Sequence, residues 1–100
     1  MHYLVCYDIT DNKLRKKIAD RLFYYGLARA QFSVFIGFVN DRYYKQMKQE
    51  MEEKIDNSSN DTDSIIFLRI NKTNLGKMII FGQLKSETNY IMADGYMIYF

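Results

Sequence analysis

The sequence is poor in the residues on which many small enzymes depend. Its 100 residues include one histidine, His2, and one cysteine, Cys6. A zinc site needs several such ligands at a regular spacing, and a Cys–His catalytic pair needs a third group that orients the histidine. The chain also has no G-x-x-x-x-G-K-[ST] loop and no G-x-G-x-x-G motif. Zinc and thiol catalysis are therefore excluded, and nucleoside triphosphate hydrolysis and dinucleotide chemistry are unsupported.

Other absences limit the kind of fold and its location. The chain has no proline, no apolar run near the roughly 20 residues of a membrane span, and no start typical of a signal peptide. A single cysteine cannot form an internal disulfide. With 48% hydrophobic residues, we expect one globular, soluble domain in the cytoplasm, with no membrane partner.

The net charge of +2 is small, but it is unevenly distributed. Residues 1–50 carry nine of the 14 Lys and Arg residues and five of the 12 Asp and Glu residues. The first half is thus net positive and the second half net negative. Such a basic half indicates either a phosphate-binding surface or a solvated face.

The apolar pattern predicts an α+β fold. Continuous apolar runs favour strands covered on both faces, and a 3.6-residue stripe favours amphipathic helices. The residues between 27 and 39 form one bent strand or a hairpin that turns near 31–33, and we favour two strands. Gly26 ends the first helix, and 71–77 form a turn with room for a short helical piece. We expect helices at 12–25 and 42–56, and strands at 2–9, 27–39, 65–70, 78–81 and 96–100.

This order of elements is that of a ferredoxin-like βαββαβ split sandwich with extra C-terminal strands. We expect a ferredoxin-like domain over 1–82 and a tail over 83–100 whose edge strand packs on a dimer. In this fold the helices cover one face of the sheet. Because the strands here are apolar on both faces, we expect a second copy to cover the other face and form a homodimer.

The first strand ends on a carboxylate, Asp8. Alternation places Asp8 on the same strand face as Leu4 and Cys6. If that face meets a partner subunit, two Asp8 carboxylates approach each other and repel, unless a proton or a cation lies between them. Mg²⁺ or Mn²⁺ would suit such a site and would support phosphodiester hydrolysis. The alternative is that Asp8 is a helix cap or a solvent-facing turn residue.

Basic residues on the first helix are candidates for nucleic-acid binding. Lys13, Lys17 and Arg21 follow one flank of this helix, which begins beside Asp8, and could contact phosphates. A solvated helix face is the alternative. The 16 aromatic residues could stack on bases, but core packing explains all except Tyr24, Tyr43 and Tyr90.

Four short motifs stand out together along the first 82 residues. They are Tyr7-Asp8-Ile9-Thr10-Asp11, Tyr25-Gly26, Arg29-Ala30-Gln31-Phe32-Ser33-Val34-Phe35 and Asp63-Ser64-Ile65. Together they resemble the small CRISPR-associated endonuclease of the Cas-two family, over about residues 1–82. The resemblance implies a ferredoxin-like homodimer acting in spacer acquisition, which bridges copies of the CRISPR integrase and holds duplex DNA. For some members it also implies Mg²⁺-dependent cleavage of RNA or double-stranded DNA.

The resemblance also implies roles for individual residues. Asp8 takes the position of the metal-binding, catalytic aspartate, and Tyr7 that of its aromatic neighbour. The family's helix arginine falls on Arg15, its second-strand arginine on Arg29, and its Ser-Val-Phe block on Ser33 and Phe35. Lys17 departs from relatives that have arginine there, and lysine lacks the two-pronged phosphate contact of a guanidinium.

Three functions stay open at this stage. The first is a metal-dependent endonuclease acting on RNA or double-stranded DNA. The second is a non-catalytic adaptor that binds duplex DNA and docks the CRISPR integrase. The third is a toxin-like ribonuclease on the same fold.

Overall fold

The fold was analysed in a computed structural model, which describes residues 1–79, 81, 90–93 and 96–99. The elements follow the predicted order of strand, helix, two strands, helix and strand. A short helix and two strands come after them. Their bounds are β1 His2–Asp8, α1 Asn12–Tyr24, β2 Ala28–Gln31, β3 Val34–Phe38, α2 Asp41–Asp56, β4 Ser64–Ile70, α3 Lys72–Gly76, β5 Tyr90–Ala93 and β6 Tyr96–Tyr99.

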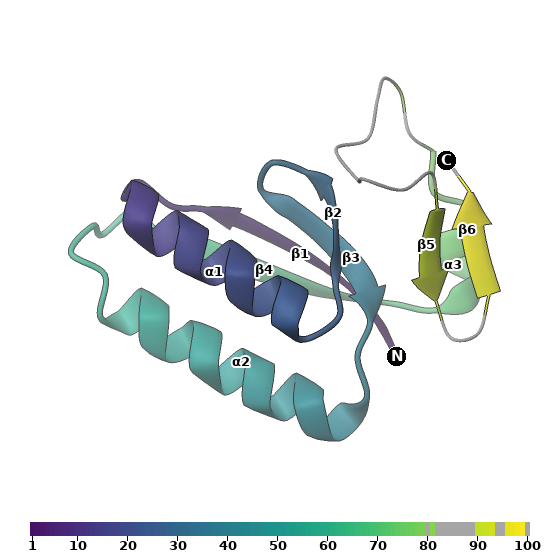
Figure 1. Ribbon diagram of the computed structural model, residues 1–100, viewed down its shortest axis with the longest axis horizontal. Helices are drawn as coiled ribbons and strands as arrows, with labels where there is room; N and C mark the ends of the chain where they lie inside the picture. The colour runs from purple at the N-terminus through teal and green to yellow at the C-terminus, as the bar shows by residue number, and fades with distance from the viewer. Residues whose placement is uncertain (80, 82–89, 94–95, 100) are drawn as a thin grey trace.

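The first four strands form one sheet in the order β2-β3-β1-β4. Each neighbouring pair in this sheet is antiparallel. Helices α1 and α2 lie side by side across one face of it (Figure 1). The predicted α+β class is therefore confirmed, and the stretch 27–39 forms two strands with a turn at Phe32 and Ser33.

The main core lies between the sheet and the two helices. Alternate β1 residues Tyr3, Val5 and Tyr7 are buried there, as expected for a strand with a side-chain period of two. Each helix contributes an apolar stripe, as its predicted amphipathic pattern implies. In these stripes Ile18, Leu22, Met47 and Met51 are almost fully buried, and Leu14, Tyr44 and Ile55 pack beside them.

Local signals define the helix ends. The Asp11 carboxylate accepts a hydrogen bond from the Leu14 amide at 2.9 Å and is the N-cap of α1. Asn40 caps α2 in the same way through the Tyr43 amide. Such side chains satisfy amides that have no partner inside the helix. After α1, Gly26 has φ 93°, a conformation that glycine adopts without steric cost.

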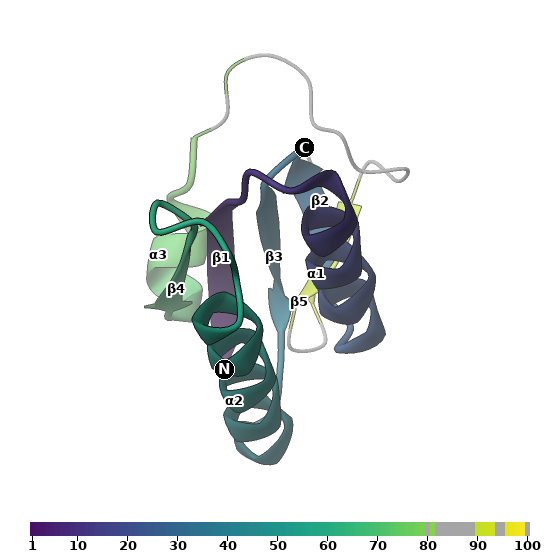
Figure 2. The same cartoon turned by 90° about the vertical axis from the view of Figure 1, so that its left-hand side faces the viewer.

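The second face of the sheet is only partly covered within the described residues. Leu75 of α3 packs with Ala30 and Ile36 on this face, and Figure 2 shows α3 on the far side of the sheet from α1. Ile66 and Leu68 on the edge strand β4 stay 63% and 54% exposed. Part of the apolar second face is thus open to solvent.

The predicted strand at 78–81 is wrong for the residues that the structure describes. Met78, Ile79 and Phe81 lie outside any strand, and Ile80 falls outside the described residues. An apolar run predicts burial, but a strand also needs a neighbour that accepts its hydrogen bonds. Ile79 and Phe81 lack cover as well as a pairing partner and are 76% and 91% exposed.

Two strands near the C-terminus form a separate antiparallel hairpin. β6 covers most of the strand expected at 96–100, while Phe100 lies outside the described residues. β5 lies in a stretch for which we predicted no element, and it comes close to β3. The predicted boundary at 82 and the packing of the tail on a dimer fall largely outside the described residues and stay predictions.

No helix in the described part of the chain is long and apolar enough to span a membrane.

Candidate functional site

Asp8 ends β1 at an exposed position on the sheet face opposite the helices. It pairs with Ser64 of β4, and its side chain shares its face with Leu4 and Cys6, which are half-buried. The Asp8 carboxylate makes no hydrogen bond or ion pair with any residue that the structure describes. Since Asp11 caps α1, the interpretation of Asp8 as the helix cap is wrong.

A second carboxylate, Asp63, holds the loop that follows Asp8. It accepts hydrogen bonds from the Ser58 hydroxyl and, at 2.9 Å, from the Thr10 amide. These bonds favour the charged form and lower the pKa of Asp63. Sequence reasoning used Asp63 only as part of a motif. Its place directly before an apolar strand was the signal, but Thr10 lies 53 residues away along the chain, too far to be identified as its partner.

The described residues of one chain do not make a metal site by themselves. The described residues contain no group of three His, Cys, Asp or Glu side chains that could hold an ion. Asp8 offers a single carboxylate, whereas Mg²⁺ in proteins commonly takes one or two carboxylates and keeps several waters. The residues therefore fit a divalent cation only if a second chain brings its own carboxylate to Asp8.

Tyr7 points away from Asp8, into the core beneath the helices. Its hydroxyl donates to the Phe32 carbonyl at 3.1 Å, and its amide donates to the Ser33 carbonyl at 3.0 Å. Its ring stacks against the fully buried ring of Phe35. Tyr7 and Phe35 thus fix the turn between β2 and β3, and Tyr7 and Asp8 lie on opposite faces of β1.

Four of the predicted site residues do come together around a surface pocket of about 600 Å³, which we call the arginine pocket. Arg15 reaches it from α1, donating to the Ile9 carbonyl at 3.2 Å and to the Asn12 side chain. Arg29 reaches it from β2. The pocket is lined by Tyr7, Asn12, Arg15, Lys16, Ala19, Asp20, Phe23, Arg29, Phe32 and Ser33.

Arg29 is held by aromatic rings. Its guanidinium carbon lies 5.4 Å from the ring centre of Phe23 and 5.2 Å from that of Phe35, within the range of cation–π attraction. Its Nε is buried and has no acceptor among the described residues. Arg29 therefore keeps hydrogen-bonding capacity that its own chain does not use.

The aromatic residues only partly match expectation. Tyr24 and Tyr43 are 66% and 49% exposed, as predicted, and the side chain of Tyr90 lies outside the described part of the chain. The prediction of core packing is wrong for Phe23, Phe32, Phe38 and Phe81, which are 47%, 70%, 38% and 91% exposed. Phe32 is exposed because it sits at the tip of the β2–β3 turn, a position that strand composition alone does not reveal.

The lysines of α1 lie elsewhere. Lys13 is exposed, and Lys17 lines a separate pocket of about 410 Å³ that also includes Asp11, Glu50 and Lys54. Neither residue lines the arginine pocket. The basic flank of α1 is therefore not a single surface around Arg15.

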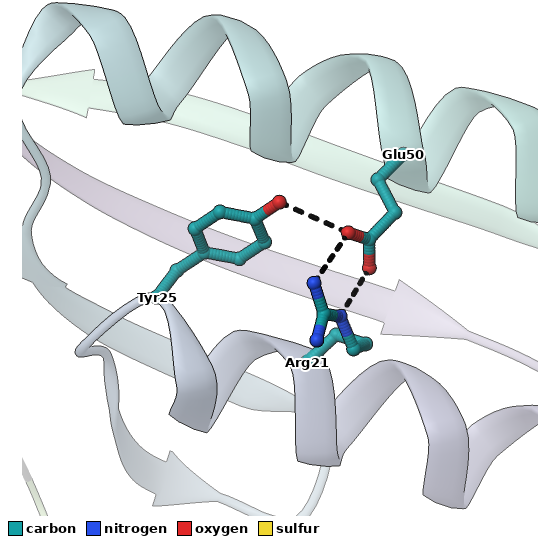
Figure 3. A network of polar contacts seen from close by, with 3 residues as sticks. All are labelled: Arg21, Tyr25 and Glu50. Atoms are coloured by element: carbon teal, nitrogen blue, oxygen red, sulfur yellow. Dashed lines mark hydrogen bonds and ion pairs between the residues drawn. The ribbon is translucent and has the colours of Figure 1, made fainter.

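Arg21 is engaged inside the protein. Its Nε and a terminal nitrogen donate to the two carboxylate oxygens of Glu50 on α2 at 2.7 and 2.8 Å. The Tyr25 hydroxyl donates to the same carboxylate at 2.9 Å (Figure 3). The Arg21 guanidinium also lies 4.2 Å from the ring centre of Tyr24. This Arg21–Glu50–Tyr25 network ties α1 to α2.

The Arg21–Glu50–Tyr25 network changes the pKa of each of its three members. The hydrogen bond between Arg21 and Glu50 lowers the pKa of Glu50 and raises the pKa of Arg21. Burial, followed by the bond to Glu50, raises the pKa of Tyr25. A phosphate contact at Arg21 would therefore have to compete with Glu50. Sequence reasoning missed Glu50 because it lies 29 residues from Arg21.

The fold and site together define a small α+β domain with an unpartnered strand-end carboxylate and a nearby arginine pocket. Residues 1–78 match the family described as CRISPR associated protein Cas2. The chain belongs to this Cas2 family.

Individual relatives agree with this assignment. The chain is 42% identical over 52 residues to "CRISPR-associated endoribonuclease Cas2 2" of Pyrobaculum aerophilum, a match over 52% of this chain and 57% of the relative. It is 38% identical over 55 residues to a "CRISPR-associated endonuclease Cas1/endonuclease Cas2 fusion" of Thermoproteus tenax, over 55% of this chain and 21% of the fusion. The match thus spans little more than half the length of the first relative.

A solved structure has a similar fold. The crystal structure of Streptococcus pyogenes Cas2 at pH 6.5 superposes with a TM-score of 0.69 at 26% identity, over 82% of this chain and all of that chain. The four-stranded antiparallel sheet with its helices is thus a Cas2-like arrangement. At family level, the relatives' names support nuclease activity.

Proposed function

We propose that this protein is a divalent-metal-dependent endonuclease of a CRISPR system, active as a homodimer and cleaving RNA. The observation that carries the proposal is the exposed Asp8 carboxylate, which has no partner among the described residues and ends a strand on the open face of the sheet. A relative named as an endoribonuclease supports RNA as the substrate. Double-stranded DNA is the alternative substrate.

Two Asp8 side chains, one from each subunit, would hold Mg²⁺ or Mn²⁺. Such an ion, when bound, supplies Lewis-acid activation of water and of the phosphodiester. The chain's own contribution is to fix the strand end. Asp63 binds the Thr10 amide beyond Asp8, and the Ser64 pairing holds the Asp8 backbone. Both contacts keep the carboxylate at a defined place on the sheet face.

The homodimer is supported by the apolar character of the open face. Ile66 and Leu68 share this face with Asp8 and are more than half exposed. Burying them against a second copy would be favourable by about 1.5–3 kcal/mol per side chain. The strand order β2-β3-β1-β4 supports a ferredoxin-like arrangement, in which the helices cover one face of the sheet and the other face is left for a partner.

Basic residues would position the nucleic-acid backbone. Arg15 and Arg29 form no ion pair with a carboxylate in the described residues, so both can bind phosphate. Lys13 and Lys17 would add longer-range attraction. Arg21 would take part only by leaving Glu50.

A second candidate function is a bridge that joins duplex DNA to the CRISPR integrase. It is favoured by the relative in which a Cas1 and a Cas2 endonuclease are fused in one chain. If the protein acts as such a bridge, the basic residues of α1 are needed for function and the Asp8 carboxylate is not. The two functions are compatible in one protein, and the substitution of Asp8 separates them.

The test is a cleavage assay on RNA, single-stranded DNA and duplex DNA with and without Mg²⁺, using wild type and Asp8→Asn. We expect metal-dependent cleavage of RNA that falls at least about hundredfold in Asp8→Asn, by analogy with the loss of a transition-state electrostatic group. Asp56→Asn, an exposed carboxylate at the end of α2 that lines neither pocket, is the matched control and should retain activity. Cleavage that survives in Asp8→Asn would contradict the proposal.

A further inference from the structure

The arginine pocket combines positive charge with exposed aromatic surface. Of the three cations that line the pocket, Lys16 pairs with Asp20 at 2.9 Å, whereas Arg15 and Arg29 have no carboxylate partner among the described residues. Arg29 keeps a buried Nε without an acceptor. Two such guanidinium groups at one pocket favour an anion, and phosphate matches their planar donors best.

Phosphate alone does not explain the rest of the pocket. Phe23 and Phe32 line it and are 47% and 70% exposed. An exposed phenylalanine beside arginines gives a flat apolar surface on which a planar ring can stack. The ligand that fits both features is an anion that carries an aromatic ring.

The position of Phe32 is fixed by the backbone of its turn. Tyr7 donates its hydroxyl to the Phe32 carbonyl and its amide to the Ser33 carbonyl. The ring of Tyr7 is itself buried against Phe35. The turn is therefore ordered before any ligand arrives, and less entropy is lost on binding than with a free loop.

The pocket has the size of a site for a small ligand, such as one nucleotide unit. A volume of about 600 Å³ lies within the roughly 300–1,000 Å³ of small-molecule sites. A base inside a duplex already stacks on its neighbours, whereas an unpaired base can leave the strand and stack on protein aromatic rings. The pocket thus favours a single strand over a duplex.

We propose that the arginine pocket binds one unpaired nucleotide of a single-stranded nucleic acid, with its base on Phe32 and Phe23 and its phosphate on Arg15 and Arg29. The pocket lies on the helix side of β1, whereas Asp8 faces the other side. It is a holding site for the strand, separate from the metal-binding carboxylate. The inference rests on the proposed function only in taking the ligand to be a nucleic acid.

The absence of tryptophan from the chain allows a direct test. In Phe32→Trp, the only indole lies at the tip of the β2–β3 turn, and stacking of a base on it quenches its fluorescence. The probes are a single-stranded RNA of about ten nucleotides, the single-stranded DNA of the same sequence, and the matching duplex. EDTA is present, so that binding is measured without metal-dependent cleavage. Tyr43→Trp, on an exposed aromatic of α2, is the control.

We expect both single strands to quench Trp at position 32 and the duplex to quench it little, with little change at position 43. In wild type, fluorescence anisotropy of the labelled single strand should give a dissociation constant that rises about tenfold in Phe32→Ala, from the loss of one stacked base. Thermal unfolding of each variant verifies that it is folded. No quenching at position 32, equal quenching at both positions, or equal quenching by the duplex would overturn the proposal.

A double variant separates this inference from the nuclease function. Phe32→Trp combined with Asp8→Asn should lose cleavage and retain the quenching by single strands. Loss of quenching in that double variant would overturn the claim that the pocket is separate from Asp8. If wild type cleaves RNA but no strand quenches Phe32→Trp, the proposal that the pocket binds a nucleotide is wrong. The proposed nuclease function would not be affected by that result.

Discussion

Asp8 differs from the neighbouring acids in having no partner within the described residues. Asp11 caps α1, Asp20 pairs with Lys16, Glu50 binds Arg21, and Asp63 binds Thr10 and Ser58. An acid that stabilises its own fold is a poor candidate for a ligand site, because binding would have to break that bond. Exposed acids such as Glu52 and Asp56 also have no hydrogen-bond or ion-pair partner among the described residues, but only Asp8 combines this with a strand end on the open sheet face, among the acids that the structure describes.

At the same scale, the Tyr25 hydroxyl makes one defined contribution to stability. Tyr25→Phe removes its hydrogen bond to Glu50 and keeps the buried ring. We expect the free energy of unfolding to fall by about 1.5 kcal/mol, the lower end of the range for a hydrogen bond to a charged group. Urea unfolding measures it, and Tyr24→Phe, whose ring is mostly exposed, should change little. Equal stability of Tyr25→Phe and wild type would contradict the network.

Arg29 yields a prediction for activity. Arg29→Lys retains the charge but loses the planar group that lies over Phe23 and Phe35. We expect cleavage of RNA to fall about tenfold, because lysine cannot make a two-pronged phosphate contact. Arg42→Lys, at an exposed position on α2, is the control. Cleavage rates of the two variants that do not differ would argue against a role for Arg29 in binding.

Elements were predictable where the signal was local. The stripes Leu14–Ile18–Leu22 and Tyr44–Met47–Met51 join residues at most four positions apart. The burial alternation of β1 likewise depends only on its own residues. These features follow from the geometry of a single helix or strand, so sequence alone could reveal them.

Predictions were wrong where the structure depends on contacts with residues far along the chain. The apolar run at 78–81 has the composition of a strand, yet its described residues pair with nothing. The exposure of Phe32 depends on where the hairpin turns, and the engagement of Arg21 depends on a residue of another helix. Composition does not specify such distant partners. The grouping of Tyr7, Arg15, Arg29 and Ser33 around one pocket could not be derived from composition or spacing for the same reason.

The junction between α1 and α2 predicts an acid-sensitive stability. The pKa of Glu50 is lowered in the folded state from its ordinary value of 4.5. Its contribution to stability is therefore present above pH 4.5 and is lost as the pH falls through the lower folded value. We expect wild type to lose stability from about pH 5 to pH 3 more steeply than Glu50→Gln.

Chemical unfolding at several pH values measures this difference. Some acid sensitivity should persist in Glu50→Gln, since the pKa of Asp63 is lowered too. Glu52→Gln, at an exposed position on the same helix, should follow wild type. Parallel stability curves for wild type and Glu50→Gln would contradict the assigned role of Glu50.

At the scale of the whole molecule, the open sheet face makes a prediction about assembly. Ile66→Asp places a charge on the face that carries Asp8 and Leu68. We expect the dimer dissociation constant to rise at least hundredfold, since about 1.5–3 kcal/mol is lost per buried isoleucine and each dimer contains two. Sedimentation equilibrium measures it.

Cleavage should fall with the dimer, because each subunit supplies only one Asp8. Gln46→Asp introduces the same charge on an exposed position of α2 and should leave both dimer and activity unchanged. A monomeric Ile66→Asp variant with full activity would contradict a site shared between subunits.

The sharing of one cation between two Asp8 side chains is tested most directly by counting bound metal. Titration of the wild-type protein with Mn²⁺, followed by electron paramagnetic resonance, should give one tightly bound ion per two chains. The Asp8→Asn protein should bind none at that site. One ion per chain, or binding that survives in Asp8→Asn, would contradict the account.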